Sequence, residues 1–282
     1  MLKSIKSFDD FLHLENTFKG VKFYEKDHKY KINNEVCKYS VTTLLKKYSE
    51  EFDVEKNAKN VALKQNKDIE TILKEWDFKR EYACFKGTEF HKYIENFLNR
   101  KFLSLDDEGL YRMLLKEGCE DIDSKKVKYK ETMRYMVRNF LKFYEWYDKS
   151  FHYIKSEFAV GDADSKICGT IDNLSYNKET KNLTVFDYKT NHTIKTVGFK
   201  GKTMLGELSH LQDCELSKYS LQLHIYKRIL EKKSGFKVDD LYIVWFPENR
   251  DYELITPLDL NKEAEFVLNK EVIISRKCLK IV

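Results

Sequence analysis

The sequence contains few of the residues that interrupt regular structure. Its 282 residues include only two prolines and ten glycines. Disordered segments and flexible linkers are usually rich in one or both of these residues. Apolar residues make up 42% of the chain, which is enough for a substantial core. The sequence therefore predicts one large domain, or a core with an accessory lobe, rather than domains joined by a linker.

Long hydrophobic runs are also missing. No apolar stretch approaches the ~20 residues that a membrane-spanning helix needs, so we expect no membrane partner. The first residues include acids and no uninterrupted apolar run, so they do not resemble a secretory signal or an acid-poor mitochondrial leader.

The six cysteines form no C-x-x-C pair, although such pairs are typical of zinc and iron–sulfur sites. The sequence therefore predicts no iron–sulfur cluster. Cysteines scattered in this way are expected to be separate buried or half-buried thiols in a reducing compartment. The six residues are Cys37, Cys84, Cys119, Cys168, Cys214 and Cys278.

Charge of one sign is not in large excess, because 51 basic and 46 acidic residues leave a net charge of +5. This balance is compatible with nucleic-acid binding but does not by itself imply it. Lysine, the commoner basic residue, binds phosphate as a point charge, whereas arginine favours the bidentate reading of bases. The lysine excess indicates sequence-independent backbone contact, and AT-rich coding bias explains it equally well.

Hydrophobic periodicity predicts the elements and their order. A hairpin is expected over 21–39 with a turn at Asn33-Asn34, followed by a helix capped by Ser40. Further helices are expected within 55–100 (the last over 82–100), over 126–149, over 217–233 and from about 260. Strands are expected over 152–160, 166–176, 182–190, 239–246 and 252–256. This order predicts a mixed sheet with helices on both faces, formed by residues 81–282 and carrying an accessory segment, residues 1–80.

The sequence DYKT, residues 187–190, ends one predicted strand. Side chains alternate along a strand, so Asp187 and Lys189 should point the same way. Asp172 lies fifteen residues earlier in the sequence GTID, where Gly169 would allow a backbone or phosphate to approach closely. Two carboxylates and a lysine at strand ends are the groups that metal-dependent phosphodiester hydrolysis uses. Two unrelated surface acids are the alternative.

Other residues could join this cluster. Gly87, His91 and Glu95 are four residues apart and so share one helix face, where the glycine would clear room beside the imidazole for a substrate or a cation such as Mn²⁺. A solvated histidine is the alternative. Glu157 could be a third acid, or it could simply pair with a lysine.

Several further polar residues are candidates for contact with a nucleic acid. Gln222 and Tyr226 share a helix face and could bind phosphate or orient the site, or they could belong to an ordinary amphipathic helix. Three lysines, Lys195, Lys200 and Lys202, could line a DNA groove or lie on a solvated loop.

Taken together, these motifs resemble the PD-(D/E)XK nuclease superfamily, in particular its RecB-like branch. The matching segments are GTEFH with Glu95, GTID, DYKT, and Gln222 with Tyr226, in the order that the family uses. Segments outside these motifs look like phage-encoded members, and the layout is similar to that of the mitochondrial genome-maintenance exonuclease. The resemblance implies a restriction-endonuclease-like α/β core of the order αβββαβ.

The resemblance also implies roles. Asp172, Asp187, the backbone carbonyl of Tyr188 and His91 would hold one or two Mg²⁺ or Mn²⁺ ions. Lys189 would position the attacking water. Ile171 stands where many members have proline.

The function implied is a metal-dependent DNA nuclease, in particular an exonuclease acting on ends or single strands in replication, recombination or repair. A structure- or sequence-specific endonuclease and a nucleic-acid-binding scaffold on a retired nuclease fold are the alternatives. A helicase, recombinase or replication protein could deliver the DNA, and the cytoplasm of a bacterium or phage-infected cell is the expected location.

Overall fold

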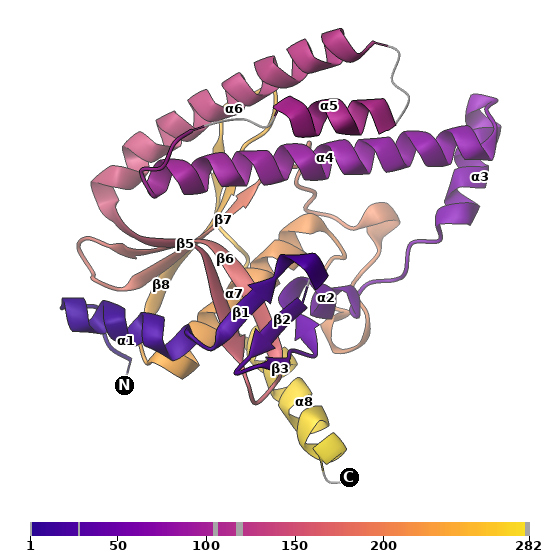
Figure 1. Cartoon of the computed structure of the whole chain (residues 1–282). Helices are drawn as coiled ribbons and strands as arrows, with labels where there is room; N and C mark the ends of the chain where they lie inside the picture. Colours follow the sequence, from indigo (N-terminus) through magenta and orange to yellow (C-terminus); the bar gives the residue numbers. More distant parts are fainter. Residues whose placement is uncertain (1, 28, 104–106, 117–120, 280–282) are drawn as a thin grey trace.

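The computed structural model describes residues 2–27, 29–103, 107–116 and 121–279. Figure 1 shows a mixed sheet with helices on both of its faces, which confirms the predicted fold class. In the described part of the chain the sheet has six strands: β4 (Tyr39–Ser40), β5 (Phe151–Asp162), β6 (Ile167–Asn177), β7 (Leu183–Lys189), β8 (Val238–Trp245) and β9 (Glu253–Ile255).

Strand β6 organises the sheet. Along one edge it pairs antiparallel with β5. Its other edge is shared, because β4 pairs parallel with residues 167–168 and β7 pairs antiparallel with residues 173–176. Strand β7 continues into a parallel pair with β8, which pairs with β9. Residues 169–172 of β6 therefore have an edge that none of the described strands pairs with.

Two apolar layers cover the sheet. Helices α4 (Ile69–Leu98), α5 (Asp107–Lys116) and α6 (Ile122–Ser150) cover one face, where Phe90, Phe140 and Phe186 share a core. The other layer includes α1 (Phe8–Phe18), α2 (Val41–Lys46), α7 (Glu215–Ser234) and α8 (Asn261–Leu279). Among the described helices, none has both the length and the apolar character needed to cross a membrane.

The helices correct one boundary. Helix α4 is continuous from Ile69, where the Asp68 side chain accepts the Thr71 N–H as an N-cap, so the predicted start at residue 82 is wrong. The division expected at residue 80 falls inside this helix. Helix α3 (Val54–Gln65) precedes it, and α1 and α5 lie in segments for which no element was expected. The N-cap predicted at Ser40 is confirmed by its bond from the Thr43 N–H.

The N-terminal hairpin lies over the sheet. Its strands are β1 (Val21–Tyr24), β2 (Lys29–Ile32) and β3 (Glu35–Val36), with the helical turn η1 (Glu25–Asp27) before β2. The predicted turn is confirmed, because Asn33 and Asn34 have φ values of 50° and 72°. Gly161 of β5 leaves the space for this packing, since a Cβ there would lie 2.9 Å from Cδ1 of Ile32.

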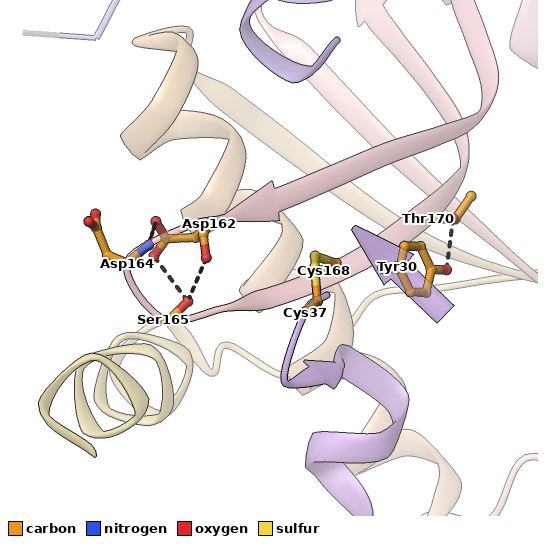
Figure 2. Close-up of a disulfide and its surroundings, with 7 residues drawn as sticks. All are labelled: Tyr30, Cys37, Asp162, Asp164, Ser165, Cys168 and Thr170. Atoms are coloured by element: carbon orange, nitrogen blue, oxygen red, sulfur yellow. Dashed lines mark hydrogen bonds between the residues drawn. A yellow bond between two sulfur atoms is a disulfide. The ribbon is translucent and has the colours of Figure 1, made fainter. Parts of the chain in front are cut away.

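A disulfide joins Cys37, after the hairpin, to Cys168 of β6, 131 residues later (Figure 2). The prediction that all the cysteines are separate thiols is therefore wrong for this pair. Spacing could not indicate it, because the two sulfurs meet only when the hairpin packs on β6. Cys84 and Cys214 are free, and the side chains of Cys119 and Cys278 lie outside the described part.

Candidate active site

Asp187 and Lys189 form the centre of the site. They lie two residues apart near the end of β7, and Nζ of Lys189 is 2.6 Å from Oδ2 of Asp187. Burial raises the pKa of Asp187 to about 6, even though the nearby ammonium acts in the opposite direction. Burial would lower the pKa of Lys189, but the charges of Asp187 and Asp172 and the hydrogen bond with Asp187 together outweigh this effect, and the pKa is raised. The predicted common direction of the two side chains is confirmed.

Asp172 lies in the middle of β6, so the expectation that it sits at a strand end is wrong. Asp172 instead lies where the pairing of β6 with β7 ends, because the last paired residues are Asn173 and Phe186. Beyond that point Oδ2 of Asp172 accepts the backbone N–H of Tyr188 at 2.7 Å. The carboxylate thus binds a backbone donor at the unpaired edge of β6, beside Asp187.

Glu157 faces Asp172 from β5. The register pairs Ser156 with Asn173 and Phe158 with Ile171, which puts Glu157 opposite Asp172. Its backbone has a φ of 48°, a strained conformation for a residue without the freedom of glycine. Although part of the side chain is exposed, loss of hydration, followed by the charges of Asp172, Glu95 and Asp187, raises the pKa of Glu157 to about 8.

His91 of α4 completes a group of three possible metal ligands. One ligand atom each from His91, Glu157 and Asp172 lie within 4.8 Å of one another. Nδ1 of His91 is 3.8 Å from Oδ2 of Asp172, and the imidazole meets the Tyr188 ring edge to face at 5.9 Å. Burial lowers the pKa of His91, while Asp172 and a hydrogen bond with the Tyr188 backbone act in the opposite direction. A lowered pKa favours the neutral, ligating form of the ring.

Gly87 and Glu95, on the same helix, have different surroundings. A Cβ on Gly87 would lie 3.2 Å from Oγ1 of Thr190, so this glycine allows α4 to pack against the end of β7. The room expected beside the imidazole is thus taken by Thr190. Glu95 is half-buried and adds its negative charge to the surroundings of Glu157.

Gln222 and Tyr226 of α7 form a hydrogen-bonded pair next to Asp187. Nε2 of Gln222 is 3.4 Å from Oδ1 of Asp187 and donates to the Tyr226 hydroxyl at 3.2 Å. The Tyr226 ring fills the space beside Gly169, where a Cβ would lie 2.5 Å from its Cε1. Gly169 therefore accommodates a tyrosine, not the backbone or phosphate that was expected.

The three predicted groove lysines lie on the segment between β7 and α7, which also contains the short turns η2 (Phe199–Gly201) and η3 (Gly206–Leu208). All three are exposed, and Lys202 forms an ion pair with Glu50. In the part of the chain that the structure describes, Lys195 and Lys200 have no such pair.

Three residues near the site, Tyr219, Asn191 and Tyr30, were not predicted. The Lys189 ammonium lies 4.6 Å from the centre of the Tyr219 ring, and the Tyr219 hydroxyl donates to Oδ1 of Asn191 at 3.1 Å. Tyr219 is one helical turn before Gln222, a spacing that could have identified it. Tyr30 of the hairpin bonds Thr170 on β6, and no local pattern marks it.

A cleft of about 770 Å³ opens next to this cluster. Its charged lining consists of three lysines and two acids, Lys46, Lys47, Lys218, Glu50 and Glu51. Phe52, 61% exposed, lies on its wall. The cleft thus combines charged and aromatic side chains, and it borders the Asp187 side of the site through Gln222.

Comparisons with known proteins give little support. No protein-family model and no curated protein matches the chain. A crystal structure from Eubacterium rectale, of a protein named "Putative exonuclease", is similar at 13% identity and a TM-score of 0.35. The match covers 69% of this chain and 65% of that chain, so this chain spans about two thirds of that structure.

Proposed function

We propose that the chain is a metal-dependent nuclease that hydrolyses phosphodiester bonds in DNA. The observation that carries this proposal is the convergence of three ligand atoms, from His91, Glu157 and Asp172, within 4.8 Å of one another. They lie beside the buried ion pair of Asp187 and Lys189. Carboxylates, an imidazole and a lysine in one place suit a divalent cation and a phosphate.

The donor groups fit Mg²⁺ or Mn²⁺. Burial raises the pKa of Glu157 to about 8 and that of Asp187 to about 6, and repulsion between the gathered carboxylates adds to both shifts. A cation would relieve that repulsion, and His91 would favour Mn²⁺. The Tyr188 carbonyl is proposed as a further ligand. When bound, the cation would supply Lewis-acid stabilisation of the phosphate oxygens.

The other residues hold this arrangement. Lys189 would direct its ammonium towards the scissile phosphate and the attacking water. Gln222 would orient Asp187 through the contact at 3.4 Å, and Tyr226 would support the amide in turn. Glu95 would add negative charge beside Glu157.

We propose single-stranded DNA or a DNA end as the substrate, cleaved as by an exonuclease. The cleft beside Gln222 offers Lys46 for a phosphate, since its other two lysines are already paired with acids, and Phe52 for stacking on an unpaired base. Lys195 and Lys200 would extend the basic surface. A helicase, recombinase or replication protein is the partner that would deliver such a strand.

The test is cleavage of end-labelled DNA, single- and double-stranded, linear and circular, with Mg²⁺, Mn²⁺ or EDTA. Metal-dependent loss of linear DNA alone, absent in Asp187→Ala, is the expected result. Cutting of covalently closed circles would replace the exonuclease with an endonuclease. Metal-independent binding without any cleavage would favour a scaffold.

A further inference from the structure

The N-terminal hairpin lies against β6 next to the acidic site. On β6 the side chains of Cys168, Thr170 and Asp172 are two residues apart and so lie on one face. The hairpin and Cys37, which follows it, contact this face at the first two positions. Cys168 forms the disulfide with Cys37, and Thr170 forms a hydrogen bond with Tyr30. The third position is Asp172, so the hairpin reaches as far as the neighbour of a proposed metal ligand.

Tyr30 is held from two sides. Its hydroxyl lies 2.9 Å from Oγ1 of Thr170 (Figure 2). Its backbone carbonyl accepts the N–H of Cys37 at 2.9 Å, and Cys37 is covalently fixed to Cys168. The disulfide therefore holds Cys37 in place, and Cys37 in turn holds the backbone of Tyr30 through this hydrogen bond.

The Tyr30 hydroxyl has unused hydrogen-bonding capacity. A phenol donates one hydrogen bond and accepts others, and the contact with Thr170 uses one of these. Its surroundings are acidic, since Glu157 and Asp172 both interact electrostatically with the phenol. It is therefore a polar group close to the acids, on an element outside the motifs that carry the nuclease resemblance.

We propose that the Cys37–Cys168 disulfide makes the hairpin part of the active site, by holding the Tyr30 hydroxyl where it positions a phosphodiester oxygen of the DNA beside Asp172. This inference rests on the proposed nuclease function. Tyr30 is a positioning residue here, because it acts on the substrate's placement and not on the reacting atoms.

Cys168 is fully buried and Cys37 is half-buried, so a dithiol would attack the disulfide at the sulfur of Cys37. Dithiothreitol supplies two electrons and two protons, the S–S bond breaks, Cys37 and Cys168 each become a thiol, and the reagent closes to its cyclic disulfide. In the reduced protein the Tyr30–Thr170 hydrogen bond, the Glu35–Lys166 ion pair and the packing of Ile32 against Gly161 would still hold the hairpin, but without a covalent link.

The first test is a pair of hydroxyl deletions in the oxidised protein. Tyr30→Phe should raise the KM for single-stranded DNA about fivefold, the loss of one hydrogen bond to the DNA, with kcat changed less than about twofold. The melting temperature should fall by only a few degrees, because the bond to Thr170 is lost as well. Tyr24→Phe, on the exposed side of the same hairpin, is the matched control and should change neither constant. An unchanged KM in Tyr30→Phe would overturn the role of the phenol.

The second test asks whether the disulfide acts through Tyr30. Reduction should raise the KM of the wild type, and Tyr30→Phe should then add little, because the two changes remove the same placement. The double variant Cys37→Ser/Cys168→Ser should behave like the reduced protein and ignore dithiothreitol. Equal effects of Tyr30→Phe in oxidised and reduced protein would overturn the coupling.

A third readout does not depend on catalysis. Hydrogen exchange of residues 21–36 should quicken on reduction, while the amides of α7 stay unchanged. Unchanged exchange of the hairpin would overturn the tether whether or not DNA is cleaved. If the wild type cleaves no DNA, the proposed function and the role of Tyr30 are both wrong. Hydrogen exchange would still show whether the disulfide holds the hairpin in place.

Discussion

The ammonium group of Lys189 lies 2.6 Å from the carboxylate of Asp187, and both side chains are largely buried. Because neither charge is well hydrated, each depends on the other for its ionised form. The pair therefore couples Asp187, which would bind the metal ion, to the Lys189 ammonium, which would face the phosphate.

Replacing Lys189 should reveal this coupling. In Lys189→Met the pKa of Asp187 should rise further above its ordinary value, because the ammonium that favours its ionised form is gone. Cleavage should fall at least about 100-fold, as expected for removal of a group that stabilises developing charge. Single-turnover cleavage with saturating Mn²⁺ measures this effect.

Lys142→Met is the matched control. Lys142 also pairs with an acid, Asp251 at 2.9 Å, but both side chains are more than half exposed. Wild-type cleavage is expected there, and wild-type cleavage in Lys189→Met would contradict the proposed role.

Stability should depend on pH in a direction that the acids fix. The pKa of Glu157 is raised from 4.5 to about 8 and that of Asp187 from 3.8 to about 6. Between these ordinary and raised pKa values the folded protein therefore binds more protons than the unfolded chain. Without metal, stability should therefore be highest at low pH within this window and fall as pH rises towards about 8.

Mn²⁺ should reverse that trend, because it binds the ionised acids and competes with protons. The increase in melting temperature caused by Mn²⁺ should therefore grow from pH 5 to pH 8. Glu157→Gln should flatten the upper part of the metal-free curve. A melting temperature that ignores Mn²⁺ at pH 8 would argue against a metal site here.

Two glycine substitutions should differ sharply. Gly169→Ala places a Cβ 2.5 Å from the Tyr226 ring, so we expect a loss of about 1–3 kcal/mol in unfolding free energy and reduced cleavage. Gly87→Ala meets only the Thr190 hydroxyl at 3.2 Å and gains helix propensity, so its stability should stay close to the wild type. Urea unfolding measures both, and equal stability of the two variants would contradict the packing role of Gly169.

The connecting segment between β7 and α7 should contribute to DNA binding unevenly. Lys195→Ala and Lys200→Ala should each weaken binding and lower the salt slope by about one, if each contacts one phosphate. Lys202→Ala should have a smaller effect because its ammonium is already paired with Glu50. Fluorescence anisotropy with a single strand at several salt concentrations, in the Asp187→Ala background, separates these outcomes. Identical slopes in all three variants would remove this segment from the proposed DNA path.

The sequence was informative where local periodicity decides the outcome. Strands β5 to β9, the Asn33-Asn34 turn and the Ser40 cap depend on residues close together, and all were predicted. Strand β4 was not, because its pairing with β6 joins residues more than 100 positions apart. The common direction of Asp187 and Lys189 follows from the same rule of alternation.

Contacts between distant segments were not predictable. Gly169 reads as room for a ligand until Tyr226, 57 residues later, is seen to fill the space. Tyr30 and Cys37 look like ordinary hairpin residues, because their partners on β6 follow more than 100 residues later. The left-handed backbone of Glu157 also has no local mark, because its sequence predicts a regular strand.

The disulfide also closes a covalent ring. Its backbone runs from Cys37 through α2 to α6 and β5 and returns at Cys168, so the three described helices that cover one face of the sheet all belong to the ring. A protease that cuts once between α4 and α6 would open the ring without releasing either fragment. On a denaturing gel the nicked protein would migrate as one species, and a reductant would separate it into two fragments. Each fragment would carry part of the proposed ligand set: His91 on one, and Glu157, Asp172 and Asp187 on the other.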